Sequence, residues 1–286
     1  MTIPISIGVA GWSYPDWQGI VYPAGVRDQL HYLCRYIDCI EINSTFYRPP
    51  ETKISQSWLD RTKNKEGFFF TAKLHQDFTH HCIIDNTMVQ QFHEGFEPML
   101  QAGNLRHLLI QFRYDFTDTP EHRVYLCRII ELFSAAFNLV VEVRHRSWQQ
   151  PEALDFLDRL QVTVANLDYP TGKDSFNLRN CSIGHTGYFR LHGRNAEKWF
   201  TKSSRDETYD YYYNTKELAE IKDRIRELLN IYPSIVVITN NHYQGSEVAN
   251  ALELKASLTG QKVMTPEDLM LRYPHLEEIA INRPLF

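Results

Sequence analysis

The sequence is poor in cysteine, and its cysteines lack the spacing that would give them a structural role. There are 5 in 286 residues, an odd number, and no two of them form a CxxC pair. Disulfide frameworks and thiolate zinc sites both depend on closely or regularly spaced cysteines. We therefore expect reduced, mostly buried thiols.

Long apolar runs and an excess of basic charge are also missing. No run approaches the roughly 18 apolar residues that a membrane helix needs, and residues 1–10 lack the basic and apolar regions of a secretory signal. We therefore expect a cytoplasmic protein with no membrane partner. The 30 Lys and Arg against 35 Asp and Glu give a formal net charge of −5. This charge argues against non-specific nucleic-acid binding and leaves a local basic patch open.

Linkers, internal repeats and a dinucleotide-binding fingerprint are absent as well. No segment rich in Pro, Gly and Ser divides the chain, and no low-complexity tract occurs. The segment after the first apolar run reads Gly11-Trp12-Ser13-Tyr14, whereas an open doubly wound sheet usually has GxGxxG there. Residues 1–286 are therefore predicted to form one domain.

What is present is a regular alternation of short apolar runs and longer amphipathic segments. The runs predict eight strands, at residues 5–10, 39–42, 68–72, 108–112, 139–143, 162–167, 188–191 and 235–239. Helical periodicity predicts helices at residues 28–37, 53–63, 88–101, 121–137, 151–160, 215–229 and 247–258. Three glycines in residues 169–187 predict an irregular crossover there. Eight such units indicate an α/β protein, a TIM-type (β/α)8 barrel with parallel strands.

Polar residues end nearly every predicted strand. In a parallel barrel such residues have left the packed interior and lie at the carboxyl-terminal face, where barrel enzymes have their active sites. Alternation along a strand places residues two apart on one face. If that face is the barrel mouth, acidic, basic and amide side chains meet there: Glu41, Asn43, Lys73, Gln111, Glu142, Arg144, His145, Asp168, Arg190, His192, Asn240 and Asn241.

A mechanistic interpretation assigns roles within this set. The candidate catalytic residues are Glu41, Glu142, Asp168 and His192, with a glutamate as base and His192 as acid or oxyanion donor. Lys73, Arg144 and Arg190 would hold an anion. The other candidate substrate-binding residues are Trp12, Asn43, His80, Gln111, His145, Arg194, Asn240 and Asn241.

A structural ion-pair network is the competing interpretation of the same residues. The two interpretations differ in what they predict for stability. Rim residues are not core, so Glu142→Gln should leave folding nearly intact if the ring is functional. A large loss of thermal stability would favour the structural interpretation.

No metal or organic cofactor follows from the sequence, and the cofactor stays unknown. His80, His81 and His145 could join Glu142, Asp168 and His192 around a divalent metal, but no HExxH or HxH spacing occurs. A metal is therefore open but not favoured. Nicotinamide, flavin and phosphate-loop fingerprints are absent, and Lys73 leaves a Schiff-base role formally open.

Aromatic residues cluster in the segments that follow the predicted strands. They include Trp12, Tyr14, Trp17, Phe46, Tyr47, Trp148, Trp199, Phe200, Tyr209 and Tyr211 to Tyr213. Such rings suit a sugar or nucleobase, and they also plug barrel rims. The loop after the seventh strand, with Lys198, Lys202 and Arg205 among its aromatics, is the best candidate for a mobile lid.

Several of these segments together resemble a known family. They are Gly11 to Tyr14 with Trp17 and Tyr22-Pro23, Glu41 to Tyr47, Thr79-His80, Glu142 to His145 with Ser147-Trp148, Arg190 to Arg194, and Asn240-Asn241 with Gly245, Asn250 and Ala251. In order and spacing the chain is similar to the YecE-like proteins, which share domain of unknown function seventy-two, over about residues 5–260.

The resemblance implies a barrel fold and lends no established reaction. Such barrels are similar in fold to the class that includes endonucleases and xylose isomerase, an analogy that does not fix function. The chain departs from the family pattern at Arg113, where proline is frequent, and at Ala10, where serine or threonine is frequent. The first departure adds a positive charge near the mouth.

Three functions remain open from the sequence. The leading one is a hydrolase, lyase or isomerase that acts on a small anionic sugar-like or nucleotide-like substrate at the carboxyl-terminal face. The second is a nucleic-acid binding or repair protein, with aromatic loops around an extruded base. The third is a ligand-binding barrel without turnover. The oligomeric state is undetermined.

Overall fold

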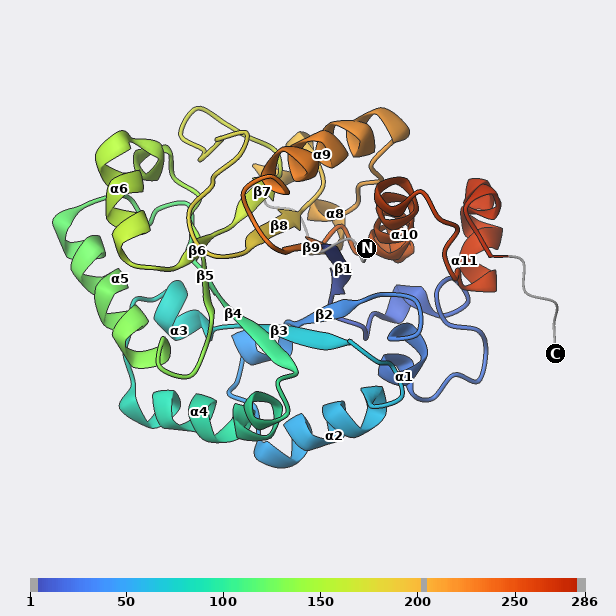
Figure 1. Ribbon diagram of the computed structural model, residues 1–286, viewed down its shortest axis with the longest axis horizontal. Coiled ribbons are helices and arrows are strands. Elements are labelled where there is room, and N and C mark those ends of the chain that lie inside the picture. Colours follow the sequence, from blue (N-terminus) through green and yellow to red (C-terminus); the bar gives the residue numbers. More distant parts are fainter. Residues whose placement is uncertain (1–4, 202–204, 282–286) are drawn as a thin grey trace.

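The computed structural model describes residues 5–201 and 205–281. Within these residues, nine strands form one parallel sheet in the order β6-β5-β4-β3-β2-β1-β9-β8-β7. The strands are β1 Ile5–Ala10, β2 Cys39–Ile42, β3 Phe69–Lys73, β4 Leu105–Gln111, β5 Leu139–Glu142, β6 Thr163–Val164, β7 Asn166–Asp168, β8 Gly187–Leu191 and β9 Ile235–Thr239. Figure 1 shows them at the centre of a surrounding layer of helices.

The sixth strand of the barrel is the place where the sheet closes. β6 pairs with β5, and β7 pairs with β8, so neighbouring parts of one short chain segment meet the two ends of the sheet. The break falls at Ala165, whose backbone N–H still donates to the Val141 carbonyl over 2.9 Å. The predicted (β/α)8 barrel is confirmed, with the sixth strand divided into two short pieces.

The helices mostly follow the predicted spans. They are α1 Gln29–Leu33, α2 Thr52–Thr62, α3 Gln76–Thr79, α4 Asn86–Gln101, α5 Pro120–Phe133, α6 Pro151–Arg159, α7 Ala196–Trp199, α8 Arg205–Thr208, α9 Thr215–Leu228, α10 Ser246–Thr259 and α11 Glu267–Arg272. The first is shorter than the predicted 28–37, and residues 169–187 contain no helix, as their glycines indicated. Single 3-10 turns cover Pro15–Trp17, Ser44–Phe46, Arg146–Gln149, Tyr243–Gly245 and Pro274–Glu278.

Local signals explain where the longest helices begin. Asp85 caps α4, and Thr119 followed by Pro120 starts α5. Asn214 and Glu217 form a capping box at the start of α9, which satisfies backbone N–H groups that the first turn leaves unpaired. Each of these helices then packs an apolar stripe against the outside of the barrel. None of the helices in the described residues is long and apolar enough to cross a membrane.

Two separate apolar cores result from the alternation of side chains along the strands. The larger one lies between strands and helices, and the smaller one fills the barrel interior. The interior core contains Ala10, Cys39, Phe69, Leu109, Val140, Ala165, Leu167, Tyr169, Tyr188, Val236 and Ile238. A residue two positions after one of these points toward the carboxyl-terminal mouth, because side chains alternate with a period of two. This rule positions the candidate site.

Candidate active site

Arg190 lies at the centre of the strand-end cluster and is 1 % exposed. Its Nε and Nη2 donate to the two carboxylate oxygens of Glu41, over 3.0 and 2.6 Å. Its Nη1 donates to Glu142 Oε2 over 2.6 Å and to Gln111 Oε1 over 3.2 Å. The guanidinium is therefore engaged on both sides by protein groups, and this geometry does not favour the predicted role of Arg190 as a clamp for a substrate anion.

Glu142 is fully buried and accepts from two arginines. Its Oε2 faces Arg190, and its Oε1 accepts from Arg144 Nε over 2.8 Å. Burial alone would raise the pKa of this carboxyl group, but the charges of Arg190 and Arg144 lower it well below the usual range. A carboxylate held in this way is a poor proton acceptor, so the geometry does not favour Glu142 as the base.

Glu41 is held as tightly. Besides the two contacts with Arg190, its Oε2 accepts from the Tyr188 hydroxyl over 3.2 Å, and the same hydroxyl lies 3.0 Å from Thr71 Oγ1. Its side chain has no exposed surface. Glu41 and Glu142 thus flank Arg190 beneath the mouth, where they orient the groups above them.

His192 lies beside this cluster with a neutral ring. Its Nε2 is 3.6 Å from Glu142 Oε1, and its Nδ1 is 2.9 Å from the Asn240 side-chain nitrogen. Burial, reinforced by Arg190, lowers the pKa of His192 to about 3. At neutral pH the ring is therefore a hydrogen-bonding group rather than a cationic acid.

Lys73 differs from every other charged member of the cluster. It ends β3, is partly buried, and makes no hydrogen bond or ion pair with any residue that the structure describes. Its Nζ lies 4.5 Å from the centroid of the Phe46 ring. Burial, with a smaller contribution from Arg190, lowers the pKa of Lys73 to about 7. A substantial share of this amine is neutral at physiological pH.

A cavity of about 840 Å³ opens above the cluster. Arg144, 16 % exposed, lines it from the strand side, and its Nη1 has no hydrogen-bond partner within the described residues. Trp199 and Tyr209 form an aromatic wall of the cavity, with ring centroids 5.9 Å apart. Trp199 also lies 5.8 Å from His192 and 5.5 Å from the Arg144 guanidinium carbon.

The expected lid lies partly in this wall. Trp199 ends α7, and Tyr209 directly follows α8. Lys202 lies outside the described residues, and so does the side chain of Arg205. Lys198 Nζ is 3.7 Å from Glu207, an ion pair that joins the two short helices.

Asp168 is not part of the mouth, contrary to expectation. Ala165, Leu167 and Tyr169 face the interior, so Asp168 faces outward. Its two oxygens accept from Arg194 over 2.9 Å each, and one also accepts from Arg224 over 3.2 Å. Asp168 and Arg194 are therefore brought to a buried network between the barrel and α9, away from Arg190.

Asn241 also faces outward, while its neighbour Asn240 faces the mouth. The Asn241 amide donates to the Tyr211 carbonyl and to Asn250 on α10, each over 2.9 Å. These contacts join the segment after β9 to the segment before α9. The position of Asn241 is that of a structural residue.

The remaining candidates lie around the mouth in different settings. Asn43 has a buried amide nitrogen without a partner in the described residues. Trp12 packs edge-on against Trp58, and His80 packs edge-on against Phe46. Burial and the charge of Lys73 lower the pKa of His80 to about 4. His145 lines the cavity, and its ring accepts from the Ser147 backbone.

Two residues of the site had no place among the candidates. Tyr169 lines the cavity with its ring 5.8 Å from Trp199, and Tyr188 holds Glu41 from below. The sequence held part of this information, because Tyr188 stands two residues before Arg190 and Tyr169 two residues after Leu167. Only the assembled barrel shows which face of the strand these positions share.

No group of three or more His, Cys, Asp and Glu side chains in residues 5–201 and 205–281 is arranged to hold a metal ion. The predicted metal candidates are instead distributed between the mouth, where His80 and His192 lie, and the outer network of Asp168. His81 is on the surface, 2.9 Å from Asp77.

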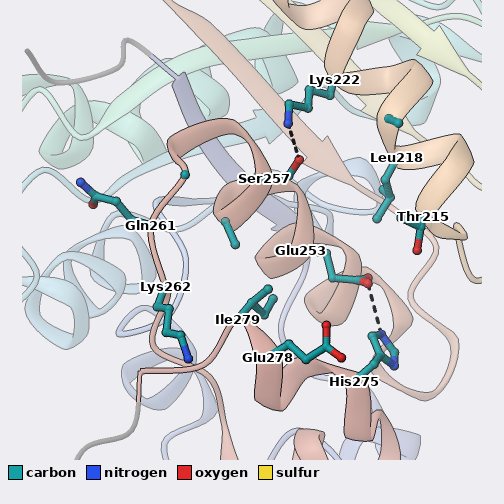
Figure 2. Close-up of a pocket in the computed structure, with 13 residues that line it drawn as sticks. Thr215, Leu218, Lys222, Glu253, Ser257, Gln261, Lys262, His275, Glu278 and Ile279 are labelled. Atoms are coloured by element: carbon teal, nitrogen blue, oxygen red, sulfur yellow. Dashed lines mark hydrogen bonds and ion pairs between the residues drawn. The ribbon is translucent and has the colours of Figure 1, made fainter.

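A second cavity, of about 610 Å³, lies between the outer helices (Figure 2). It is lined by residues of α9 and α10 and of the segment that follows them, and it contains none of the strand-end residues. Two pairs of its polar side chains contact each other: Lys222 with Ser257 over 2.8 Å, and Glu253 with His275 over 3.1 Å (Figure 2). The cavity above Arg144 is therefore the better candidate for a reaction site.

Comparison with known proteins agrees with this architecture. A family model described as "Protein of unknown function DUF72" matches residues 6–270. The chain belongs to this family. The resemblance to the YecE-like proteins is thereby confirmed.

The DUF72 chain is 27 % identical over 269 residues to the UPF0759 protein YunF of Bacillus subtilis, which is 87 % of this chain and 93 % of YunF. A solved DUF72 family protein from Thermotoga maritima has a TM-score of 0.78 at 29 % identity, covering 89 % of this chain and 99 % of that one. A D-allulose 3-epimerase from Methylomonas sp. has a TM-score of 0.51 at 14 % identity, over 88 % of this chain and 97 % of the epimerase. The last similarity shows the fold alone.

Proposed function

We propose that this DUF72 protein is an enzyme of the lyase, isomerase or hydrolase type that acts on a small anionic, sugar-like or nucleotide-like substrate at the barrel mouth. The observation that carries the proposal is that the strand-end cations differ in their partners. Arg190 donates to the buried carboxylates of Glu41 and Glu142. Within the described residues, the Lys73 amine and Arg144 Nη1 have no hydrogen-bond partner.

Arg144 is the group best suited to hold the anion. Its Nε and Nη2 face Glu142, with Nη2 2.7 Å from Oε1, which fixes the plane of the guanidinium. Nη1 can then donate into the cavity, because arginine presents its donors in a rigid fork. Lys173, which also lines the cavity, adds positive charge at its edge.

The aromatic wall suits the uncharged part of such a substrate. Trp199, Tyr209 and Tyr169 bring three rings to the cavity, and the Arg144 guanidinium lies beside Trp199. Sugar rings and nucleobases pack against aromatic faces, while polar groups opposite them fix the orientation. His192 and Asn240 provide neutral hydrogen-bonding groups at the base of this wall.

Lys73 supplies the titratable group that both glutamates lack. Neither Glu41 nor Glu142 is free to accept a proton, since each carboxylate accepts from Arg190 and from a second donor. An amine with a pKa of about 7 changes protonation near the working pH, the property that proton transfer in an active site requires. The glutamates and Arg190 are thus positioning residues.

The test is a thermal-shift screen with phosphosugars, nucleotides, carboxylated sugars and oligonucleotides, because a ligand that binds the native state raises the melting temperature. A small anion should stabilise the wild type. In Arg144→Lys its affinity should fall roughly ten-fold or more, since the fork is lost while the charge remains. Arg146→Lys is the matched control, because Arg146 is an exposed neighbour 3.9 Å from Asp174. Its affinity should stay unchanged.

Two other results would count against the proposal. A shift with oligonucleotides alone, lost steeply as salt is raised, would indicate nucleic-acid binding instead. Binding of a small anion with equal strength by wild type and Arg144→Lys would show that the anion site is elsewhere. Absence of any shift, with the whole panel at millimolar concentration, would also contradict it.

A further inference from the structure

Lys73 is a partly buried strand-end lysine with no acidic or hydroxyl partner among the residues that the structure describes. Lys53, Lys198, Lys222 and Lys255 each contact an acidic or hydroxyl side chain, at 2.6 to 3.7 Å. Lys73 lies near two carboxylates and contacts neither. The reason is that the arginines occupy them: Arg190 contacts Glu41 and Glu142, and Arg144 contacts Glu142.

We propose that Lys73 is a covalent catalyst: its Nζ attacks the carbonyl carbon of a small aldehyde or ketone that carries a carboxylate or phosphate group, and forms an imine. The inference rests on the proposed function, because the anionic group of the substrate is held by Arg144. It goes further by naming the substrate class and the bond that forms.

The position of Lys73 suits a nucleophile. Phe69, Thr71 and Lys73 alternate along β3, and Phe69 faces the barrel interior, so Lys73 faces the mouth. The Thr45 hydroxyl donates to the Lys73 carbonyl over 2.7 Å and fixes the backbone at the strand end. The side chain runs along the Phe46 ring and remains partly exposed. A reactant at Nζ would therefore displace no hydrogen-bond or ion-pair partner among the residues that the structure describes.

The electrostatic environment keeps this amine available. The nearby charges of Arg190 and Arg144 oppose those of Glu41 and Glu142, so burial dominates and lowers the pKa of Lys73 to about 7. An ordinary lysine has a pKa of about 10.4, so Lys73 holds roughly a thousand-fold more neutral amine at pH 7. The neutral amine is the form that attacks carbonyl groups.

The covalent step balances without any further reactant. The lone pair of Nζ forms the N–C bond while the carbonyl π electrons move to oxygen, which takes a proton from Nζ. The nitrogen lone pair of the resulting carbinolamine expels the hydroxyl group, which takes a proton from solvent and leaves as water, so the C=N bond forms as a protonated imine. The protonated imine then withdraws electrons from the adjacent carbon, where a C–H or C–C bond can break. Addition of water restores the amine and releases the product, with no change of oxidation state.

The experiment traps the imine in the full-length protein. Pyruvate and dihydroxyacetone phosphate serve as probes, each with sodium cyanoborohydride at pH 7, followed by intact mass and peptide mapping. The expected result is one stable adduct per chain at Lys73 with at least one probe. It should be absent in Lys73→Arg and unchanged in Lys173→Arg, because Lys173 lines the cavity that Arg144 also lines. Circular dichroism establishes that both variants are folded.

A second measurement on the wild type does not depend on any variant. Reductive methylation with formaldehyde should modify Lys73 with a half-maximal rate near pH 7, whereas exposed lysines should need a pH near 10. Adducts spread over surface lysines, and equal in wild type and Lys73→Arg, would overturn the inference. So would a Lys73 methylation profile like that of the other lysines.

The outcomes also separate this inference from the proposed function. If pyruvate or the phosphate ester raises the melting temperature through Arg144 but leaves no adduct on Lys73, the covalent role fails and the anion site stands. If neither probe binds and a different anion does, in a manner that depends on Arg144, the carbonyl substrate class is wrong. An adduct on Lys73 that forms equally well in Arg144→Lys would contradict the role of Arg144 in holding the anion. The role of Lys73 as nucleophile would then still stand.

Discussion

Replacing Glu142 by glutamine tests whether the buried ion pairs stabilise the barrel. The sequence alone predicted nearly intact folding if the strand-end residues are functional, and a large loss of thermal stability if they form a structural ion-pair network. In the structure the side chain is fully buried, with Arg190 Nη1 at 2.6 Å and Arg144 Nη2 at 2.7 Å. Glutamine keeps the volume but removes the charge, and its amide places N–H groups or a weaker acceptor against two guanidinium groups.

The expected loss follows from these contacts. Removing one partner of a buried ion pair destabilises a protein by about 3–5 kcal/mol. Arg190 keeps Glu41 and Arg144 can gain water, so we expect the lower end, about 3 kcal/mol. With an unfolding entropy of about 2.1 cal/mol/K per residue, 286 residues give about 0.6 kcal/mol/K. The melting temperature should therefore fall by about 5 °C.

The assay is differential scanning calorimetry of wild type and Glu142→Gln at pH 7 and pH 4. The pKa of Glu142 is lowered in the folded state, so its contribution is complete above the unfolded pKa of about 4.3 and is lost as pH falls toward the folded value. The difference between the two proteins should be full at pH 7 and smaller at pH 4. Glu220→Gln is the control, because Glu220 is an exposed partner of Arg194 and should change stability by less than about 1 kcal/mol. A Glu142→Gln protein that melts within 1 °C of wild type at pH 7 would refute the reasoning, with about 5 °C expected.

Two further substitutions test the framework around the site. Asp168→Asn should lower the melting temperature by several degrees, because Arg194, Tyr213 and Arg224 lose a buried carboxylate acceptor. It should leave anion affinity unchanged, and a reduced affinity in calorimetric titrations would place Asp168 in the site. Gly95→Ala should lower the urea midpoint of unfolding, because the new Cβ would lie 2.0 Å from the Pro50 carbonyl oxygen. Gly172→Ala is the control and should not lower it, because the nearest atom, in the Phe200 ring, is 3.4 Å away. Equal midpoints for the two variants would mean that α4 shifts to accommodate the methyl group.

The sequence was sufficient to predict which segments form the barrel and which side chains stand at strand ends. Strand and helix periodicity identified the eight barrel positions, and the glycines of residues 169–187 predicted an irregular crossover, which in the structure contains no helix. Spacing within a strand also predicted that Arg190 and His192 share a face, and they do, with Nη1 and Nε2 3.3 Å apart. These are local properties, set by residues that are neighbours in the chain.

Tertiary structure decided which face each strand presents to the mouth, and which charges meet there. Alternation places Asn166 and Asp168 on one face of the strand, and the assembled barrel makes this the outer face, because Ala165, Leu167 and Tyr169 face the interior. Likewise, Glu41 and Arg190 are 149 positions apart and meet across the barrel, as do Glu142 and Arg190. Because Glu41 and Glu142 contact Arg190, Lys73 has no hydrogen-bond or ion-pair partner among the residues that the structure describes. The reason is physical: a side chain's reactivity depends on burial and on charges a few ångströms away, and barrel closure brings those charges from distant parts of the chain.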